Sequence, residues 1–199
     1  MHELNSPFYL TGGTAASTGY LNHRFSDDLD FFVNDDNNFF LWANRVITAL
    51  NSISYWEIRV TLREQRFCRL FIVAGDINLK IEMINDVPAH VGDISLHEIL
   101  GNIDSPQNIL ANKISAAIDR NEPKDLADIW GFCIKMKLSL VTALNDAGSK
   151  AAGIFPADLA RTVSVSFATV AARTKSTLPC KIGIGSKGKT TGTPALWGD

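Results

Sequence analysis

The sequence has few cysteines, no long apolar run and no excess of charge of either sign. Its three cysteines, Cys68, Cys133 and Cys180, lie far apart and form no C-x-x-C pair, which indicates neither a disulfide framework nor a thiolate metal site. No apolar run approaches the roughly 18 residues of a membrane helix, and the N-terminus lacks a signal-peptide pattern. We therefore expect a cytoplasmic protein with reduced thiols and no membrane partner.

The charge balance also limits the partners. The chain has 199 residues, of which 19 are Lys or Arg and 21 are Asp or Glu, so its formal charge is −2. Such a chain has no general attraction for nucleic acid, and any nucleic-acid partner must bind a local patch. Hydrophobic residues make up 46% of the sequence, which is typical of an ordinary globular protein with a sizeable core.

Apolar periodicity divides the chain into two regions and a tail. Strand-like alternation dominates residues 1–90, and helical spacing dominates residues 91–172, with helices that open at Ser105-Pro106 and Pro123. Residues 173–199 are rich in glycine, show no periodicity and have the composition of an irregular or disordered tail. We expect the α/β (α+β) class: a mixed sheet with flanking helices, followed by a helical region. The expected strands are residues 8–10, 28–33, 54–62, 67–74 and 77–84, and a helix is expected at residues 40–50.

The tail contains a Walker A pattern in residues 183–190. A P-loop requires a strand before this pattern and a helix after it. Only nine residues follow Thr190, and they include Gly192 and Pro194, so we do not expect ATP binding here.

A pair of aspartates in Asp28-Leu29-Asp30 is the first chemical signal. Alternate residues of a strand share a face, so the two carboxylates lie about 6.6 Å apart on the same side. At an effective dielectric constant of about 20, their repulsion is roughly 2.5 kcal/mol. A divalent cation between them would offset this repulsion. The alternative interpretation is a strand end whose aspartates face water.

A third carboxylate strengthens the metal interpretation. In residues 77–83 the odd positions are apolar, whereas Asn78, Lys80 and Glu82 share the other face. If this strand lies beside the Asp28 strand, Glu82 joins the two aspartates. Three carboxylates suit Mg²⁺, with Mn²⁺ as an alternative, and two such ions can promote phosphoryl transfer.

A glycine pair supplies the second signal. Gly12-Gly13 allows the backbone to approach a ligand closely, and Thr14 is predicted to cap a short helix that runs to Leu21. The N-terminus of such a helix offers N–H groups to phosphate. By itself, a glycine pair is more typical of a simple turn.

These motifs, in this order, resemble those of the AbiEii/AbiGii toxin family, which has the DNA polymerase β-like nucleotidyltransferase fold. The matching segments are residues 9–15, 23–26, 28–32 and 113–128. The resemblance implies a Mg²⁺-dependent nucleotidyltransferase that uses a nucleoside triphosphate, often GTP, and the toxin of a type IV toxin–antitoxin pair with a cognate antitoxin. The acceptor stays open between tRNA, a protein hydroxyl and a small molecule.

The resemblance also implies roles for individual residues. Asp28 and Asp30 would bind both metal ions, and Glu82 would bind the catalytic ion or accept the acceptor's proton. The nucleotide would contact Gly12, Gly13, Thr14, Arg24, Ser26, Lys113 and Asp125.

The residues themselves leave alternatives open. Lys113 lies within an apolar helical stripe, where it could also extend its ammonium to the stripe's edge. Arg24 and Arg120 could neutralise phosphate or form surface ion pairs, and Asp125 and Asp128 could interact with a helix N-terminus. At the level of function, the alternative is a catalytically weak nucleotide-binding regulatory or partner protein.

Overall fold

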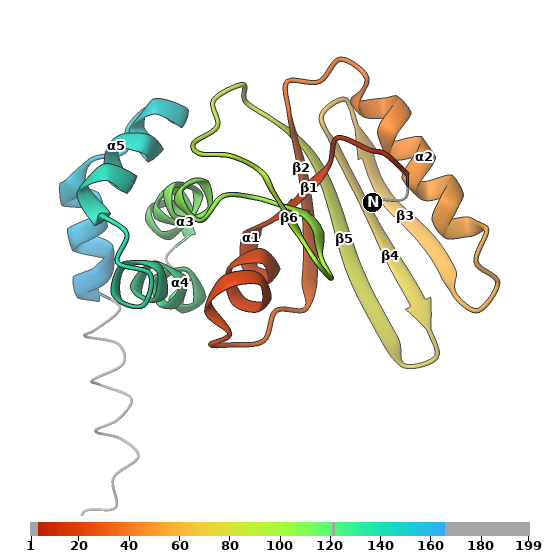
Figure 1. Ribbon diagram of the computed structural model, residues 1–199, viewed down its shortest axis with the longest axis horizontal. Helices are drawn as coiled ribbons and strands as arrows, with labels where there is room; N and C mark the ends of the chain where they lie inside the picture. Colours follow the sequence, from red (N-terminus) through yellow and green to blue (C-terminus); the bar gives the residue numbers. More distant parts are fainter. Residues whose placement is uncertain (1–3, 121, 166–199) are drawn as a thin grey trace, which may run out of the picture.

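A seven-stranded mixed sheet organises the protein, whose computed structural model describes residues 4–120 and 122–165 (Figure 1). The strand order is β3-β4-β5-β2-β1-β7-β6. The strands are β1 (Tyr9–Thr11), β2 (Asp28–Asn34), β3 (Glu57–Glu64), β4 (Phe67–Ala74), β5 (Ile77–Asp86), β6 (Ser95–His97) and β7 (Gly101–Ile103).

The centre of the sheet brings together strands that are distant in the sequence. The short strand β1 is buried throughout and pairs antiparallel with β2 and parallel with β7. On its other side β2 pairs parallel with β5, while β3, β4 and β5 form two consecutive antiparallel hairpins. The parallel pairing of β2 and β5 determines which polar side chains meet at the candidate site.

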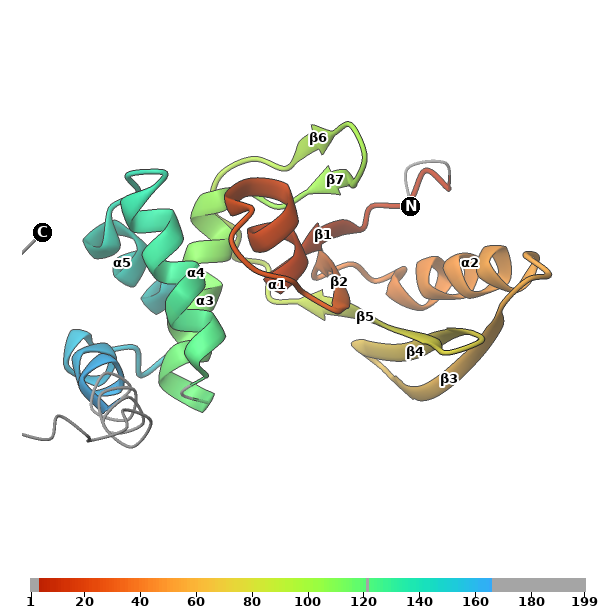
Figure 2. The ribbon, with the colours of Figure 1, turned by 90° about the horizontal axis from the view of Figure 1, so that it is seen from below.

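Helix α2 (Phe39–Asn51) covers one face of the outer strands (Figure 2). Its buried residues include Phe39, Ala43 and Val46. In β4, Cys68 and Leu70 are among the alternating buried positions, as expected for a sheet with one face against a helix. The polar positions of β2 and β5 therefore occupy the opposite face.

The remaining helices lie beyond the β1 and β2 side of the sheet (Figure 1). Helix α1 (Gly12–Thr14) continues as the π-helical segment η1 (Ala15–Leu21). They are followed by α3 (Pro106–Arg120), α4 (Pro123–Ile134) and α5 (Leu140–Lys150), and residues 156–165 are also helical. As predicted, α3 and α4 open at Pro106 and Pro123, and the Ser105 hydroxyl accepts a hydrogen bond from the Asn108 N–H.

The structure confirms the predicted fold class. Two strands were missed, β6 and β7, because three residues are too few to show a period. They add to the same sheet although they follow residue 90, and the division into regions at residues 90 and 172 stays a prediction. The predicted tail, its Walker A pattern and Cys180 lie outside the described residues. Cys68 and Cys133 are free thiols, and no helix within residues 4–120 and 122–165 is long and apolar enough to cross a membrane.

Candidate active site

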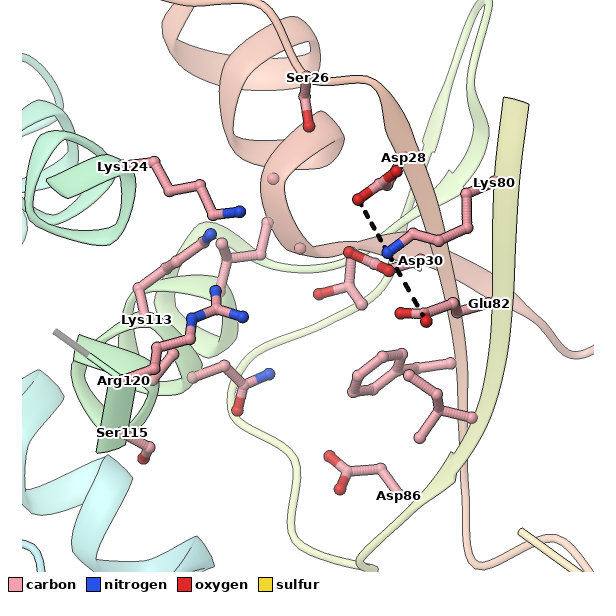
Figure 3. Close-up of a pocket in the computed structure, with 18 of the residues that line it drawn as sticks. Ser26, Asp28, Asp30, Lys80, Glu82, Asp86, Lys113, Ser115, Arg120 and Lys124 are labelled. Atoms are coloured by element: carbon pink, nitrogen blue, oxygen red, sulfur yellow. Dashed lines mark ion pairs between the residues drawn. The ribbon is translucent and has the colours of Figure 1, made fainter. Parts of the chain in front are cut away.

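Three carboxylates from β2 and β5 line one wall of a cavity of about 730 Å³ (Figure 3). In the parallel register, Asp28 lies opposite Lys80 and Asp30 lies opposite Glu82. The predicted proximity of Glu82 to the two aspartates is therefore confirmed. Alternation along each strand places all three on the face that α2 leaves uncovered.

Two of the carboxylates already have cationic partners. The Lys80 ammonium lies 2.9 Å from Asp28 Oδ2 and 3.6 Å from Glu82 Oε1. Arg69 Nε donates a hydrogen bond of 2.6 Å to the same Glu82 oxygen. Partial burial lowers the pKa of Lys80, but its hydrogen bond to Asp28 and the neighbouring carboxylates raise it by more. The lysine is thus held in its charged form.

Asp30 differs from the other two. Within the described residues its carboxylate makes no hydrogen bond or ion pair and faces the cavity. Burial, and after it the charge of Glu82, raises the pKa of Asp30 to about 6. The charges of Lys80 and Lys113 lower this pKa, but by less than burial and the neighbouring carboxylates raise it.

The donor set suits a hard divalent cation, although the described carboxylates do not surround an ion as they stand. Among residues 4–120 and 122–165, no three His, Cys, Asp or Glu side chains already form a metal-binding group. However, Asp28, Asp30 and Glu82 offer only oxygen ligands, as Mg²⁺ prefers, and no described residue forms an ion pair with Asp30. The residues fit such an ion once Lys80 gives up a carboxylate contact.

The glycine pair packs directly against this cluster. Gly12 has a φ of +66°, and a Cβ atom there would lie 2.2 Å from Asp30 Oδ2. A Cβ on Gly13 would lie 2.7 Å from Ser26 Oγ and 3.0 Å from Arg24 Nη2. Glycine adopts the positive φ at position 12 without strain, and the missing Cβ at both positions allows the close approach. β1 therefore ends directly against Asp30, Ser26 and Arg24.

The predicted capping role of Thr14 is wrong. The helical turn begins two residues earlier, at Gly12, with Thr11 as its N-cap. Thr14 directly precedes the π-helical part that runs to Leu21, but its side chain makes no capping hydrogen bond there. The Thr14 hydroxyl instead donates a hydrogen bond to the main-chain carbonyl of Asp28. Thr14 thus joins the glycine turn to the start of β2, because the folded chain places that carbonyl within reach.

A cationic wall of the cavity, formed by Lys113, Arg120 and Lys124, lies opposite the carboxylates (Figure 3). Lys113 is 7% exposed, and its ammonium lies 2.9 Å from Asp125 Oδ1 and 2.8 Å from Asp128 Oδ2. The lysine is therefore a buried ion-pair partner rather than a side chain that extends to solvent.

The acidic partners behind this wall are fully buried. Arg120 Nε donates a 2.8 Å hydrogen bond to Asp125. Burial alone would raise the pKa of Asp125, but its bonds to Arg120 and Lys113 hold that pKa below its usual range.

Arg24 lies in the loop before β2 and pairs with an acidic residue behind the cationic wall. Its guanidinium makes two 2.7 Å hydrogen bonds to Asp128 of α4, and it also lines the cavity next to Ser26. Asp128 therefore pairs with both Arg24 and Lys113. These contacts attach α4 to the loop that precedes β2.

Several residues at the site were not predicted to act there. Lys80 and Arg69 contact the carboxylates, and the shared face of Lys80 and Glu82 in residues 77–83 was the signal that could have placed the lysine. Asp104 is also buried, and it accepts a 2.5 Å hydrogen bond from Thr11, directly before the glycine pair. Nothing in the sequence near Asp104 indicated that contact, because 93 positions separate the two residues.

Two solved structures share the fold of this chain. Over 87% of this chain, the structure is similar to JHP933 from Helicobacter pylori, with 19% identity, 89% of that chain covered and a TM-score of 0.53. A candidate nucleotidyltransferase from H. pylori gives 20% identity, coverage of 87% of this chain and 90% of that one, and a TM-score of 0.54. The fold is that of a nucleotidyltransferase.

The sequence specifies the family. The family model for the nucleotidyl transferase AbiEii toxin of type IV toxin–antitoxin systems matches residues 2–147. The chain therefore belongs to the AbiEii nucleotidyl transferase toxin family, and it is a nucleotidyltransferase. No curated protein sequence matched it.

Proposed function

We propose that this toxin transfers a nucleotide from a nucleoside triphosphate to an acceptor, with divalent ions held by Asp28, Asp30 and Glu82. One observation carries the proposal: the register of β2 and β5 places Asp30 beside Glu82 on the wall of a cavity of about 730 Å³. The opposite wall is cationic, and the glycine turn touches Asp30. This arrangement separates a metal-binding side from a phosphate-binding side.

The proposed roles follow from the chemistry of each side chain. Mg²⁺, or Mn²⁺ in its place, would neutralise phosphate charge and activate the attacking oxygen. We expect two such ions, because paired divalent ions can stabilise both the attacking and the leaving oxygen in phosphoryl transfer. Glu82, beside Asp30, would contact the catalytic ion or accept the acceptor's proton. The side chain of Asp28 would share in binding both ions.

The phosphate side uses main-chain and side-chain donors. Gly12, Gly13 and Thr14 open a helix whose first N–H groups have no intrahelical acceptor. Arg24 and Ser26 line the cavity next to this turn, and Lys113 adds a charge that Asp125 orients. Because phosphoryl transfer depends on positioning and on neutralisation of charge, this fixed arrangement would supply most of the rate enhancement.

We extend this proposal to the nucleotide, the acceptor and the cellular partner. GTP is the first nucleoside triphosphate to test, and tRNA and protein hydroxyls are the first acceptors, with a cognate antitoxin as the cellular partner. The surface charge of the chain gives no general attraction for RNA. An RNA acceptor would therefore bind locally, at the cavity.

The test removes the carboxylates and follows the transferred label. The protein is incubated with a nucleoside triphosphate labelled at its α-phosphate, a divalent ion and separate RNA and protein fractions as acceptors. We expect the double variant Asp28→Ala, Asp30→Ala to lower labelling by about a hundredfold or more. Asp76→Ala, in the exposed turn between β4 and β5, is the matched control and should keep full labelling.

Unchanged labelling in the double variant would refute the assignment of the site. Calorimetry with GTP separates the alternative function. Nucleotide binding without labelled product in any acceptor fraction would instead favour a regulatory nucleotide-binding protein.

A further inference from the structure

Lys80 occupies the space between two of the proposed metal ligands (Figure 3). Its ammonium is 2.9 Å from Asp28 Oδ2 and 3.6 Å from Glu82 Oε1. Its backbone position is fixed, because Lys80 lies directly opposite Asp28 in the parallel register of β2 and β5. The lysine is therefore part of the carboxylate cluster.

One oxygen of Asp28 and one of Glu82 face this ammonium. Glu82 also accepts a hydrogen bond from Arg69, so two cations already share its charge. No metal-binding group of three His, Cys, Asp or Glu side chains exists in the described part of the chain. A divalent ion that recruits Asp28 and Glu82 must therefore replace Lys80 at one or both carboxylates.

The displaced ammonium has a substitute partner within the same cavity. Lys80 is 28% exposed and lines the cavity wall, so its flexible side chain can turn toward the open space. A bound triphosphate would bring anionic oxygens into that space. The lysine would then exchange a carboxylate for a phosphate, while the divalent ion takes the vacated oxygens.

We propose that Lys80 is a resident counter-ion that competes with a divalent ion for Asp28 and Glu82 and is released by triphosphate. This inference rests on the proposed function and adds a positioning residue to it. Lys80 keeps the negative charges together before substrate binds. It also makes metal binding weak until the triphosphate arrives.

The proposal predicts effects of opposite sign for two ligands. Lys80→Gln removes the competing charge, so Mn²⁺ should bind the nucleotide-free protein about tenfold more tightly, which corresponds to about 1.4 kcal/mol. Inorganic triphosphate, tested without metal, should bind several-fold more weakly, because its ammonium partner is lost. A side chain that only supports the fold would instead weaken both ligands.

The measurements use the full chain and do not depend on turnover. Electron paramagnetic resonance of free Mn²⁺ gives the metal affinity, and calorimetry gives the affinity for inorganic triphosphate. Lys80→Arg, which keeps the charge, should retain the weak Mn²⁺ binding of the unchanged protein. Arg59→Gln removes a cation of β3 that does not line the cavity and pairs with exposed Glu57, and it should leave the Mn²⁺ affinity unchanged.

The outcomes separate this inference from the proposed function. Unchanged or weaker Mn²⁺ binding in Lys80→Gln, or unchanged triphosphate binding, would overturn the proposal that Lys80 moves from the carboxylates to a phosphate. Asp30→Asn tests the metal site itself and should weaken Mn²⁺ binding. If Asp30→Asn has no effect, the proposed metal site fails, whereas a loss in Asp30→Asn with no gain in Lys80→Gln refutes only the role of Lys80.

Discussion

Asp30 carries the least compensated charge of the site. Its neighbours Asp28 and Glu82 form ion pairs with Lys80 and Arg69, whereas among the described residues Asp30 forms none. Burial and the charge of Glu82 therefore favour its protonated form and raise its pKa to about 6. At the residue scale, the ionised form of Asp30 destabilises the folded protein, and a bound cation would relieve this destabilisation.

This cost predicts a pH-dependent effect of Asp30→Asn on stability. The pKa of Asp30 is about 6 in the folded protein, against 3.8 for a free side chain. Its ionisation therefore lowers stability as the pH rises through that interval. At pH 7 without divalent ions, we expect Asp30→Asn to raise the free energy of unfolding by on the order of 1–3 kcal/mol.

Urea unfolding at a series of pH values checks this expectation. The advantage of Asp30→Asn should disappear below the ordinary pKa of an aspartate, because both side chains are then neutral. Asp28→Asn is the control, since it removes the contact with Lys80 and should give no such gain. If Asp30→Asn changed the free energy of unfolding by the same amount at every pH, the change would not come from the ionisation of Asp30.

At the scale of elements, the end of β1 positions the proposed phosphate-binding turn against the proposed metal ligands. Gly12 turns the chain out of the strand with a positive φ, directly against Asp30, and the first helical residues follow at once. Thr11, before the turn, is held by buried Asp104. The turn is therefore fixed from both sides and cannot move away from an added side chain without a cost.

Gly12→Ala should consequently weaken both the fold and metal binding. The positive φ costs about 1–2 kcal/mol for a residue with a Cβ, and the new atom would displace the Asp30 carboxylate. Gly75→Ala is a matched control, because Gly75 has a φ of +58° and open space around it. We expect both variants to lose stability in urea unfolding, but only Gly12→Ala to lose Mn²⁺ affinity. Equal Mn²⁺ affinity in the two variants would contradict the contact between the turn and Asp30.

At the scale of the whole molecule, a buried ion-pair network joins the helical region to the sheet. Asp128 of α4 receives two hydrogen bonds from Arg24, which precedes β2, and also pairs with Lys113 of α3. Lys113 in turn contacts Asp125. Since these residues also form or support the cationic wall of the cavity, the shape of the site depends on how the two parts are joined.

Asp128→Asn is therefore expected to be strongly destabilising. It removes the charge that balances Arg24 and Lys113 at a fully buried position, and the loss of one partner from such a group typically costs about 3–5 kcal/mol. Urea unfolding measures the change. The control is Asp158→Asn, which removes a more exposed pair with Arg161 and should change stability little. A small effect at Asp128 would mean that the network does not hold the two parts together.

Much of the local structure followed from short-range pattern. Alternation placed Asp28 and Asp30 on one face of a strand, and the same alternation put Lys80 and Glu82 on one face of another. Proline positions predicted the starts of α3 and α4. The capping role of Thr14 was predicted wrongly, because a hydroxyl has several possible acceptors and the sequence does not show which one the fold brings near.

The sequence by itself determined which side chains share a face, since a strand's period depends only on its own backbone. Only the tertiary structure decided which faces meet. The pairing of β2 with the distant strand β5, on the side opposite its sequence neighbour β1, brought Asp30 to Glu82. The same pairing placed Lys80 between Asp28 and Glu82. Likewise, Arg24 donates a hydrogen bond to Asp128, which lies 104 positions away in the sequence. Such contacts depend on how the whole chain buries its apolar faces, and no local period encodes that choice.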